Sequence, residues 1–202
     1  CQQGTAVSVG GVTIREGGEA KPIKVRPVKE YNEAVQVYAD GVEAGRVDYS
    51  RVELKLREVI KKEPNLADAW FNLGVIQQEE GRVEDAKKAY QKTLEIDPKY
   101  MDALANLGLM QMESGDREGA IAAFEKAVEI DPFNPAARNN LAVVYRTNAV
   151  KSRQAGDLER SQRDFQKAVG HVRKVLAGDS QNIDAYNNLA LIYYDLRKYE
   201  LA

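Results

Sequence analysis

The chain has 202 residues, of which 44% are hydrophobic and 30% are charged, and its formal net charge is −2. This composition is ordinary for a folded globular protein. The near balance of charge excludes the overall basic field on which nucleic-acid binding depends. No apolar run approaches the ~18–20 residues that a membrane-spanning helix needs.

Residues 1–30 are predicted to form a mostly non-helical linker, because glycines and prolines interrupt this stretch too often for a helix. Val7–Val9 and Val12–Ile14 flank a pair of glycines, as the two strands of a short hairpin would. The segment also carries the only cysteine of the sequence, Cys1. A single cysteine allows neither an intrachain disulfide nor a cysteine-based metal cluster.

The first four residues, Cys1-Gln2-Gln3-Gly4, resemble the start of a mature bacterial lipoprotein, in which the cysteine carries acyl chains. The resemblance implies that a lipidated Cys1 holds the protein on a membrane and that residues 1–30 serve as a tether. Because Gln2 is not the Asp associated with inner-membrane retention, the resemblance further implies the periplasmic face of the outer membrane. In the alternative, Cys1 carries no lipid and the protein is soluble in the cytoplasm.

From residue 31 onward, the sequence repeats with a period of 34 residues. A period of this length is typical of paired helices that stack on their neighbours to bury a shared core. Prolines, leucines, small residues and aromatic residues recur in register. The matched positions are Pro64, Pro98 and Pro132; Leu73, Leu107 and Leu141; Gly74 and Gly108; Gly81 and Gly115; Ala86 and Ala120; Tyr90 and Phe124.

The unit that contains Trp70-Phe71-Asn72-Leu73-Gly74 resembles a repeat of the tetratricopeptide-repeat family. Gly81 has the place of the turn between its two helices, and Asp97-Pro98 ends its second helix. The resemblance implies an all-α fold, a helix-turn-helix solenoid wound as a right-handed superhelix. The repeats are expected at residues 31–66, 67–100, 101–134 and 135–182, followed by a partial repeat at 183–202.

The repeat at 135–182 is 14 residues longer than the period. Gly115 and Gly156 are 41 residues apart, so seven of the extra residues precede Gly156 and seven follow it. Seven residues are about two helical turns, so we expect both helices of this repeat to be elongated and to meet at Ala155-Gly156-Asp157. The result would be a basic spike, which either is a solvated surface or binds a partner. Its basic residues include Lys151, Arg153, Arg160 and Arg163.

In the tetratricopeptide-repeat family, the first helices of the repeats line a concave groove that binds peptides. The resemblance therefore implies a groove that combines a ladder of asparagine amides with apolar residues and carboxylates, which suits a segment with apolar anchors and basic side chains. Phe71, Val75 and Ala136 stand where the carboxylate clamp of chaperone-binding members has polar or basic groups, so that subtype is excluded. The groove positions are Asp68, Phe71, Asn72, Val75, Glu79, Asp102, Asn106, Leu109, Met112, Glu113, Asn139, Asn140, Val143, Arg146, Asn187, Asn188, Leu191 and Tyr194.

The sequence contains no recognisable catalytic arrangement. Its only histidine, His171, falls within a predicted helix, where a lone histidine is typical of packing or of the surface, and no nucleophile stands near the paired carboxylates. No glycine-rich phosphate loop follows a strand, and no set of His, Cys and Asp has the spacing of a zinc site. We therefore expect no enzymatic activity, metal, cofactor or small-molecule substrate.

These features favour a non-catalytic scaffold for protein–protein interaction. With a lipid anchor, the chain resembles tetratricopeptide-repeat lipoproteins that assemble bacterial envelope machines, namely type IV pilus pilotins and gliding-motility lipoproteins. The implied partners are an outer-membrane barrel, a secretin or a motility-complex subunit. In the alternative, the chain is a soluble adaptor or the regulatory subunit of an enzyme complex. Nucleic acid is not an expected partner in either case.

Overall fold

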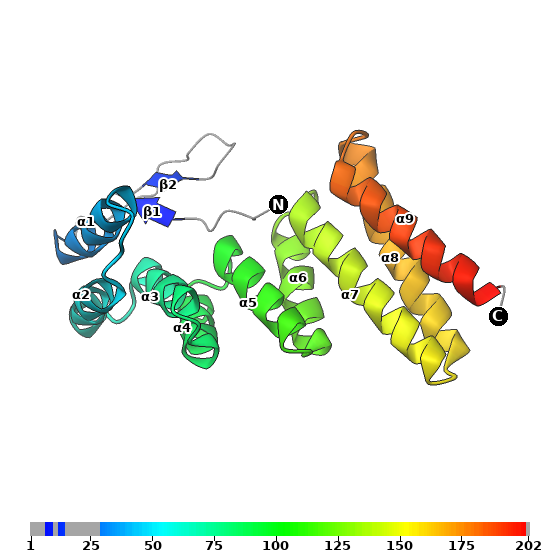
Figure 1. The fold of residues 1–202 in the computed structure, drawn as a ribbon, viewed down its shortest axis with the longest axis horizontal. Coiled ribbons are helices and arrows are strands. Elements are labelled where there is room, and N and C mark those ends of the chain that lie inside the picture. The colour runs from blue at the N-terminus through cyan, green and yellow to red at the C-terminus, as the bar shows by residue number, and fades with distance from the viewer. Residues whose placement is uncertain (1–6, 10–11, 15–28, 201–202) are drawn as a thin grey trace. The chain divides into compact units, whose positions relative to one another are not determined.

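The structure is a computed structural model that describes the backbone of residues 7–9, 12–14 and 29–200 and the side chains of residues 29–197 (Figure 1). Strands β1 (Val7–Val9) and β2 (Val12–Ile14) pair antiparallel, with Val7 opposite Ile14 and Val9 opposite Val12. Every other regular element in the described ranges is a helix, which confirms the predicted all-α fold. Cys1 lies outside the described residues.

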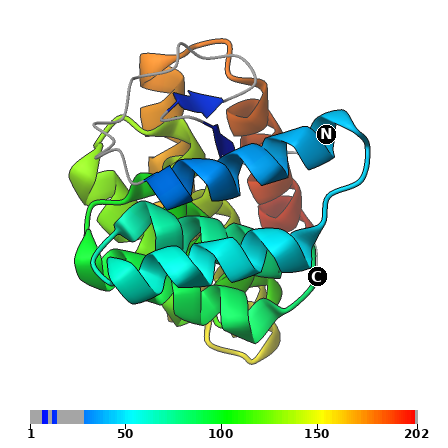
Figure 2. The ribbon, with the colours of Figure 1, turned by 90° about the vertical axis from the view of Figure 1, so that its left-hand side faces the viewer.

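The helices in the described ranges are α1 (Lys29–Glu43), α2 (Tyr49–Lys62), α3 (Ala67–Glu79), α4 (Val83–Ile96), α5 (Met101–Glu113), α6 (Arg117–Ile130), α7 (Pro135–Gln154), α8 (Leu158–Gly178) and α9 (Ile183–Glu200). Helices α1 to α8 form consecutive antiparallel pairs, and α9 follows the last pair. The helices fall into two compact units, whose boundary lies within α5 at Ala103 and Leu104. In the first unit, the short turn between α1 and α2 lets them pack side by side, as Figure 2 shows from their end of the unit.

The turns within the helix pairs lie where the repeat pattern predicts them. Gly81, between α3 and α4, has a φ of 74°, and Gly115, between α5 and α6, has a φ of 83°. A residue with a Cβ atom rarely adopts these angles, so glycine ends the first helix and allows the chain to reverse. Asp116 then caps α6, because its side chain accepts a hydrogen bond from the Gly119 N–H.

Helix α7 has 20 residues and α8 has 21, whereas the helices from α2 to α6 have 13 or 14. Gly156, with a φ of 84°, forms the turn between α7 and α8 at the predicted tip, and Asp157 caps α8. The buried faces stay in register along the added length. Ala149 on α7 and Phe165 on α8 belong to the same core cluster as Leu141.

Each unit has its own hydrophobic core. In the first unit, apolar residues of α1, α2, α3 and α4 form one buried cluster that includes Ala34, Leu56 and Leu73. In the second unit, the cluster spans α6, α7, α8 and α9 and includes Phe124 and Ile192. Stacking of successive helix pairs thus supplies the core that one pair alone could not bury.

Candidate functional site

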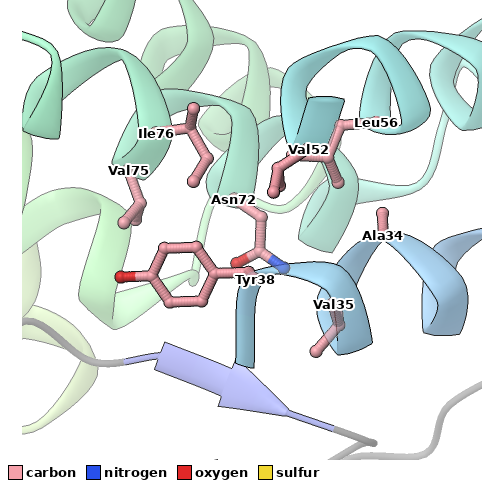
Figure 3. A pocket seen from close by; sticks show the side chains of 8 residues that line it. All are labelled: Ala34, Val35, Tyr38, Val52, Leu56, Asn72, Val75 and Ile76. Carbon is pink, nitrogen blue, oxygen red and sulfur yellow. The ribbon is translucent and has the colours of Figure 1, made fainter. Parts of the chain in front are cut away.

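A small pocket opens between α1, α2 and α3 in the first unit (Figure 3). Its wall is almost entirely apolar, with the amide of Asn72 and the phenol of Tyr38 as the polar groups. Asn72, Val75 and Ile76 come from α3, and the predicted groove positions 72 and 75 therefore lie at this pocket. The full lining is Ala34, Val35, Tyr38, Val52, Leu56, Asn72, Val75 and Ile76.

Asn72 is joined to α1 by a hydrogen bond. Its Nδ2 donates to the Oη atom of Tyr31 over 2.8 Å, and both side chains are at least partly buried. One donor of the predicted amide ladder is thus engaged within the fold. Tyr31 was not among the predicted groove residues, although Tyr31 and Tyr38, seven residues apart, share one face of α1.

Tyr38 lies half-buried at this pocket and stays a neutral donor. Burial raises the pKa of its hydroxyl, and the negative charge of Glu79 raises it further, with a contribution from Tyr49. A neutral phenol can donate a hydrogen bond to a carbonyl or carboxylate oxygen of a bound segment. Glu79, a predicted groove position, is exposed at the end of α3.

Phe71 is part of the packing of the first unit. The side chain is 2% exposed, and its ring lies 4.9 Å from the Tyr100 ring and 5.7 Å from the Tyr90 ring, measured between centroids. The Tyr100 hydroxyl donates to Asp68 Oδ1 over 2.8 Å. Burial and the Asp68 carboxylate together raise the pKa of Tyr100. Phe71 therefore has almost no surface to offer a ligand, and Asp68 already accepts an internal hydrogen bond; Val75 is buried as well.

In the second unit, α7 and α9 bring three of the predicted side chains close to one another or to a charged partner. Asn188 Nδ2 lies 3.4 Å from Asn139 Oδ1, and Arg146 Nη1 lies 3.2 Å from Asp195 Oδ2. Leu191 is three residues from Asn188 and four from Asp195, so it shares their helix face. Leu191 is 46% exposed and Tyr194 is 66% exposed. This α7–α9 surface, defined by Asn139, Arg146, Asn188, Leu191, Tyr194 and Asp195, combines amides, an ion pair and exposed apolar groups.

The other predicted groove residues differ in exposure. Leu109 and Met112 are partly buried against the core of the second unit. Glu113 and Asn187 are exposed. The remaining residues are half-buried, and they are Asp102, Asn106, Asn140 and Val143.

The predicted basic spike carries internal ion pairs. Arg160 lies 3.9 Å from Asp164, and Arg163 lies 3.6 Å from Glu159, each pair one helical turn apart on α8. Lys151 is exposed, and Arg153 is half-buried with an interaction partner of its own. The charge that the spike presents is therefore smaller than the sequence count suggests.

His171 lies half-buried on α8, and its ring stacks on Tyr145 with the centroids 5.8 Å apart. Burial lowers its pKa to about 4, and the positive charges of Arg138, Lys174 and Lys167 lower it further against the opposing effect of Glu125. The imidazole is therefore neutral at pH 7. Across residues 29–197, no group of three or more His, Cys, Asp and Glu could hold a metal ion. No helix in the described part of the chain is long and apolar enough to cross a membrane.

Three stretches of the chain match models of one repeat family. Residues 67–100 match "Tetratricopeptide repeat", residues 110–148 match "TPR repeat" and residues 153–202 match a second "Tetratricopeptide repeat" model. Together these stretches cover more than half of the sequence. Among curated proteins, none matches the chain.

Several solved structures share the fold at low sequence identity. A tetratricopeptide repeat protein from Parabacteroides merdae ATCC 43184 has a TM-score of 0.70 and 20% identity, over 85% of this chain and 62% of that protein. MamA has a TM-score of 0.54 and 18% identity, over 86% of this chain and 97% of MamA. The first TPR domain of Spaghetti (RPAP3), bound to the HSP90 peptide SRMEEVD, has a TM-score of 0.52 and 17% identity, over 65% of this chain and 93% of that one. This chain thus spans less than two thirds of the length of the Parabacteroides protein.

Proposed function

We propose that this chain, which belongs to the tetratricopeptide-repeat family, is a non-catalytic scaffold that binds a segment of a partner protein on its α7–α9 surface. The observation that carries the proposal is the exposure of Leu191, one helical turn from the amide of Asn188 on α9, and of Tyr194, one turn further along the same helix. Large apolar side chains in solvent next to polar groups that can pair with a backbone are a common feature of protein-binding surfaces. Repeats of this family serve protein–protein interaction in general.

The chemistry of the α7–α9 surface indicates what kind of segment fits it. Leu191 and Tyr194 would contact apolar side chains of the partner. Asn188 has donor and acceptor atoms for the partner's backbone, and the Arg146–Asp195 pair can exchange its internal contact for a contact with a charged side chain. An extended or helical segment with one or two apolar anchors is therefore the proposed ligand. The RPAP3 structure, with its bound HSP90 peptide, shows one peptide complex on a related fold.

Site-specific photo-cross-linking in the source cells tests this proposal. Benzoylphenylalanine at position 194 or at position 191 is expected to give the same cross-linked protein. The matched control is position 83 on α4, where Val83 is also an exposed apolar residue but lies outside the α7–α9 surface. A shared product from positions 191 and 194 that is absent from position 83 supports the surface. Equal products from all three positions contradict it.

We further propose that the scaffold is lipid-anchored at Cys1 and assembles a machine of the bacterial envelope. Support comes from the lipoprotein-like start Cys1-Gln2-Gln3-Gly4 alone. Metabolic labelling with a fatty acid tests it, with Cys1→Ala as the control. Label on the wild type but not on the variant supports the lipid anchor. Cross-links to an outer-membrane barrel, a secretin or a motility subunit support the location in the bacterial envelope. An unlabelled wild type that cross-links to soluble proteins alone favours the soluble adaptor.

A further inference from the structure

A second pocket lies between α2, α3 and α4, three helices that follow one another in the first unit (Figure 1). Its volume is about 340 Å³, near the lower end of the ~300–1,000 Å³ typical of ligand sites. It shares no residue with the α1–α3 pocket and none with the α7–α9 surface. The lining residues are Arg57, Trp70, Leu73, Gln77, Asp85, Lys88, Ala89 and Lys92.

Gln77 leaves an unsatisfied acceptor at this pocket. The residue is 3% exposed, and its Oε1 atom is buried without a hydrogen-bond partner among the described residues. Two periods later, the equivalent position holds Tyr145, a larger side chain that is 4% exposed and donates its hydroxyl to Glu125. A shorter side chain at position 77 leaves space that a tyrosine would fill. A buried polar atom without a partner costs ~1–3 kcal/mol, so a ligand that donates a hydrogen bond there gains affinity.

The rest of the wall is aromatic and mostly cationic. Trp70 is fixed in place because its Nε1 donates to the Pro64 carbonyl over 2.9 Å. Lys88 is exposed, and no ion pair among the described side chains engages it. Arg57 pairs with Glu53 over 2.7 Å, and Lys92 pairs with Glu95 over 2.6 Å.

Lys92 and Glu95 form a solvent-exposed pair of the kind that contributes little to stability, so Lys92 can turn toward a ligand. The Arg57 side chain is 56% exposed, but its partner Glu53 is only 15% exposed and also pairs with Arg82. Against three cations, the lining has one carboxylate, that of Asp85. Because Arg57 and Lys92 each have a carboxylate partner, Lys88 is the one cation of this lining without an ion pair among the described side chains, so the pocket favours a single negative charge. The equivalent positions of Trp70 and Lys88 in the next repeat are Leu104 and Ala122, so this combination belongs to the repeat at 67–100.

We infer that this pocket binds an acidic side chain of a peptide, with the carboxylate on Lys88 and Lys92 and a peptide N–H donating to Gln77 Oε1. The Trp70 ring would pack against the methylene groups next to the carboxylate. A phosphate dianion fits less well, because Asp85 opposes a second negative charge and a dianion has little donor capacity for Gln77. The site lies between α2, α3 and α4 and shares no residue with the predicted groove positions, so it would give the scaffold a second contact.

Trp70 is the only tryptophan of the chain, so its fluorescence reports directly on this pocket. The probe is the peptide acetyl-Gly-Glu-Gly-Glu-Gly-amide, and the matched neutral peptide has Gln in place of both Glu residues. We expect a saturable fluorescence change with the acidic peptide and binding at least about tenfold weaker with the neutral one. Added salt should weaken the binding of the acidic peptide, because the attraction is electrostatic.

Two variants and two controls assign the signal to the pocket. Lys88→Glu changes an exposed residue and is expected to weaken binding about tenfold or more. Gln77→Tyr is expected to abolish binding by filling the space, as a tyrosine does at position 145. The controls make the same two kinds of replacement one repeat later. Because the equivalent of Lys88 is Ala122, the lysine control is Lys126→Glu, at the equivalent of Lys92, and the glutamine control is Gln111→Tyr, at the equivalent of Gln77; both should leave the affinity unchanged.

Circular dichroism on every variant checks that the helices remain, and calorimetry replaces fluorescence for Gln77→Tyr, whose new ring lies near Trp70. The inference is overturned by the absence of a saturable change up to millimolar acidic peptide, or by equal binding of the acidic and neutral peptides. Inorganic phosphate that binds as tightly as the acidic peptide would also overturn it, because the pocket would then be a general anion site. The inference is also overturned if the Lys88→Glu variant folds but binds the acidic peptide as tightly as the wild type.

Discussion

The ring of Tyr90 fills the space beside Gly74, and a Cβ atom on that glycine would lie 2.7 Å from the ring. The same relationship recurs between Gly108 and Phe124 in the second unit, also at 2.7 Å. In both cases, the glycine lets the second helix of the repeat approach the first, and the aromatic side chain takes the place of the missing methyl group. This repeated contact explains why the glycine and the aromatic residue both recur in the sequence with the 34-residue period.

Gly74→Ala is therefore expected to destabilise the protein, although alanine is the better helix former. Overpacking against Tyr90 should cost ~1–3 kcal/mol, which exceeds the ~1 kcal/mol that alanine gains in a helix interior. Gly170→Ala is the matched control, because Gly170 also lies within a helix but a Cβ atom there meets nothing within 4 Å. Urea unfolding followed by circular dichroism should show a loss for position 74 and a gain for position 170. Equal gains at both positions would contradict the close packing.

The hydrogen bond between Asn72 and Tyr31 predicts energetic coupling between α3 and α1. Asn72→Ala and Tyr31→Phe each remove the same bond and should each cost ~0.5–1.5 kcal/mol. In the double variant, the two costs should not add, because the bond can be lost only once. A double-mutant cycle on the free energy of unfolding measures this coupling. Fully additive costs would mean that Asn72 contributes nothing through Tyr31 and is available to a ligand.

His171 predicts a loss of stability in mild acid. Its pKa is about 4 in the fold but about 6.5 in an unfolded chain, so below pH 6.5 the unfolded state binds a proton that the folded state does not. Stability should fall as the pH drops from about 6.5 and level off near pH 4. Since water screens a half-buried ring, the expected loss is ~1–2 kcal/mol.

The variant His171→Phe keeps an aromatic ring next to Tyr145 and removes the titration. The measurement is the difference in unfolding free energy between wild type and variant at several pH values. This difference cancels the effect of carboxylates that both proteins share. It should be constant above pH 7 and shift in favour of the variant below pH 6. A difference that does not depend on pH would show that His171 titrates normally.

Local sequence signals predicted the helix pairs because the residues that end a helix are themselves local. Gly81 and Gly156 have the positive φ angles that the turns need, and Pro98 follows the end of α4. The elongation of α7 and α8 was also predictable, since a count of residues between equivalent glycines needs no knowledge of side-chain contacts.

Side-chain partners far apart in the sequence were less predictable. Tyr31 lies 41 residues before Asn72, in a repeat too divergent for position-by-position comparison. The burial of Phe71 depends on Tyr100, which lies in the loop after α4, outside the helical pattern. A family position can therefore indicate which helix carries a residue without showing whether that side chain is free to bind.

Leu191 and Ile192 are neighbours on α9 with opposite environments. Variants at the two positions therefore distinguish an effect on folding from an effect on binding. Ile192 is completely buried in the core of the second unit, whereas Leu191 is 46% exposed on the α7–α9 surface. Ile192→Ala should cost ~2–5 kcal/mol and lower the melting temperature, since it leaves a cavity beneath α9. Leu191→Ala should change stability by no more than about 0.5 kcal/mol, as is usual for an exposed position.

Partner binding should respond in the opposite way, with a larger loss of affinity for Leu191→Ala than for Ile192→Ala. Once photo-cross-linking at position 194 has identified a partner, its affinity for each variant can be measured by calorimetry at a temperature where both variants are folded. Leu191→Ala should weaken binding about tenfold, because it removes an apolar anchor of the proposed contact. Ile192→Ala should leave the affinity nearly unchanged, because its side chain reaches no surface. If Leu191→Ala binds as tightly as the wild type, the partner does not use this face of α9.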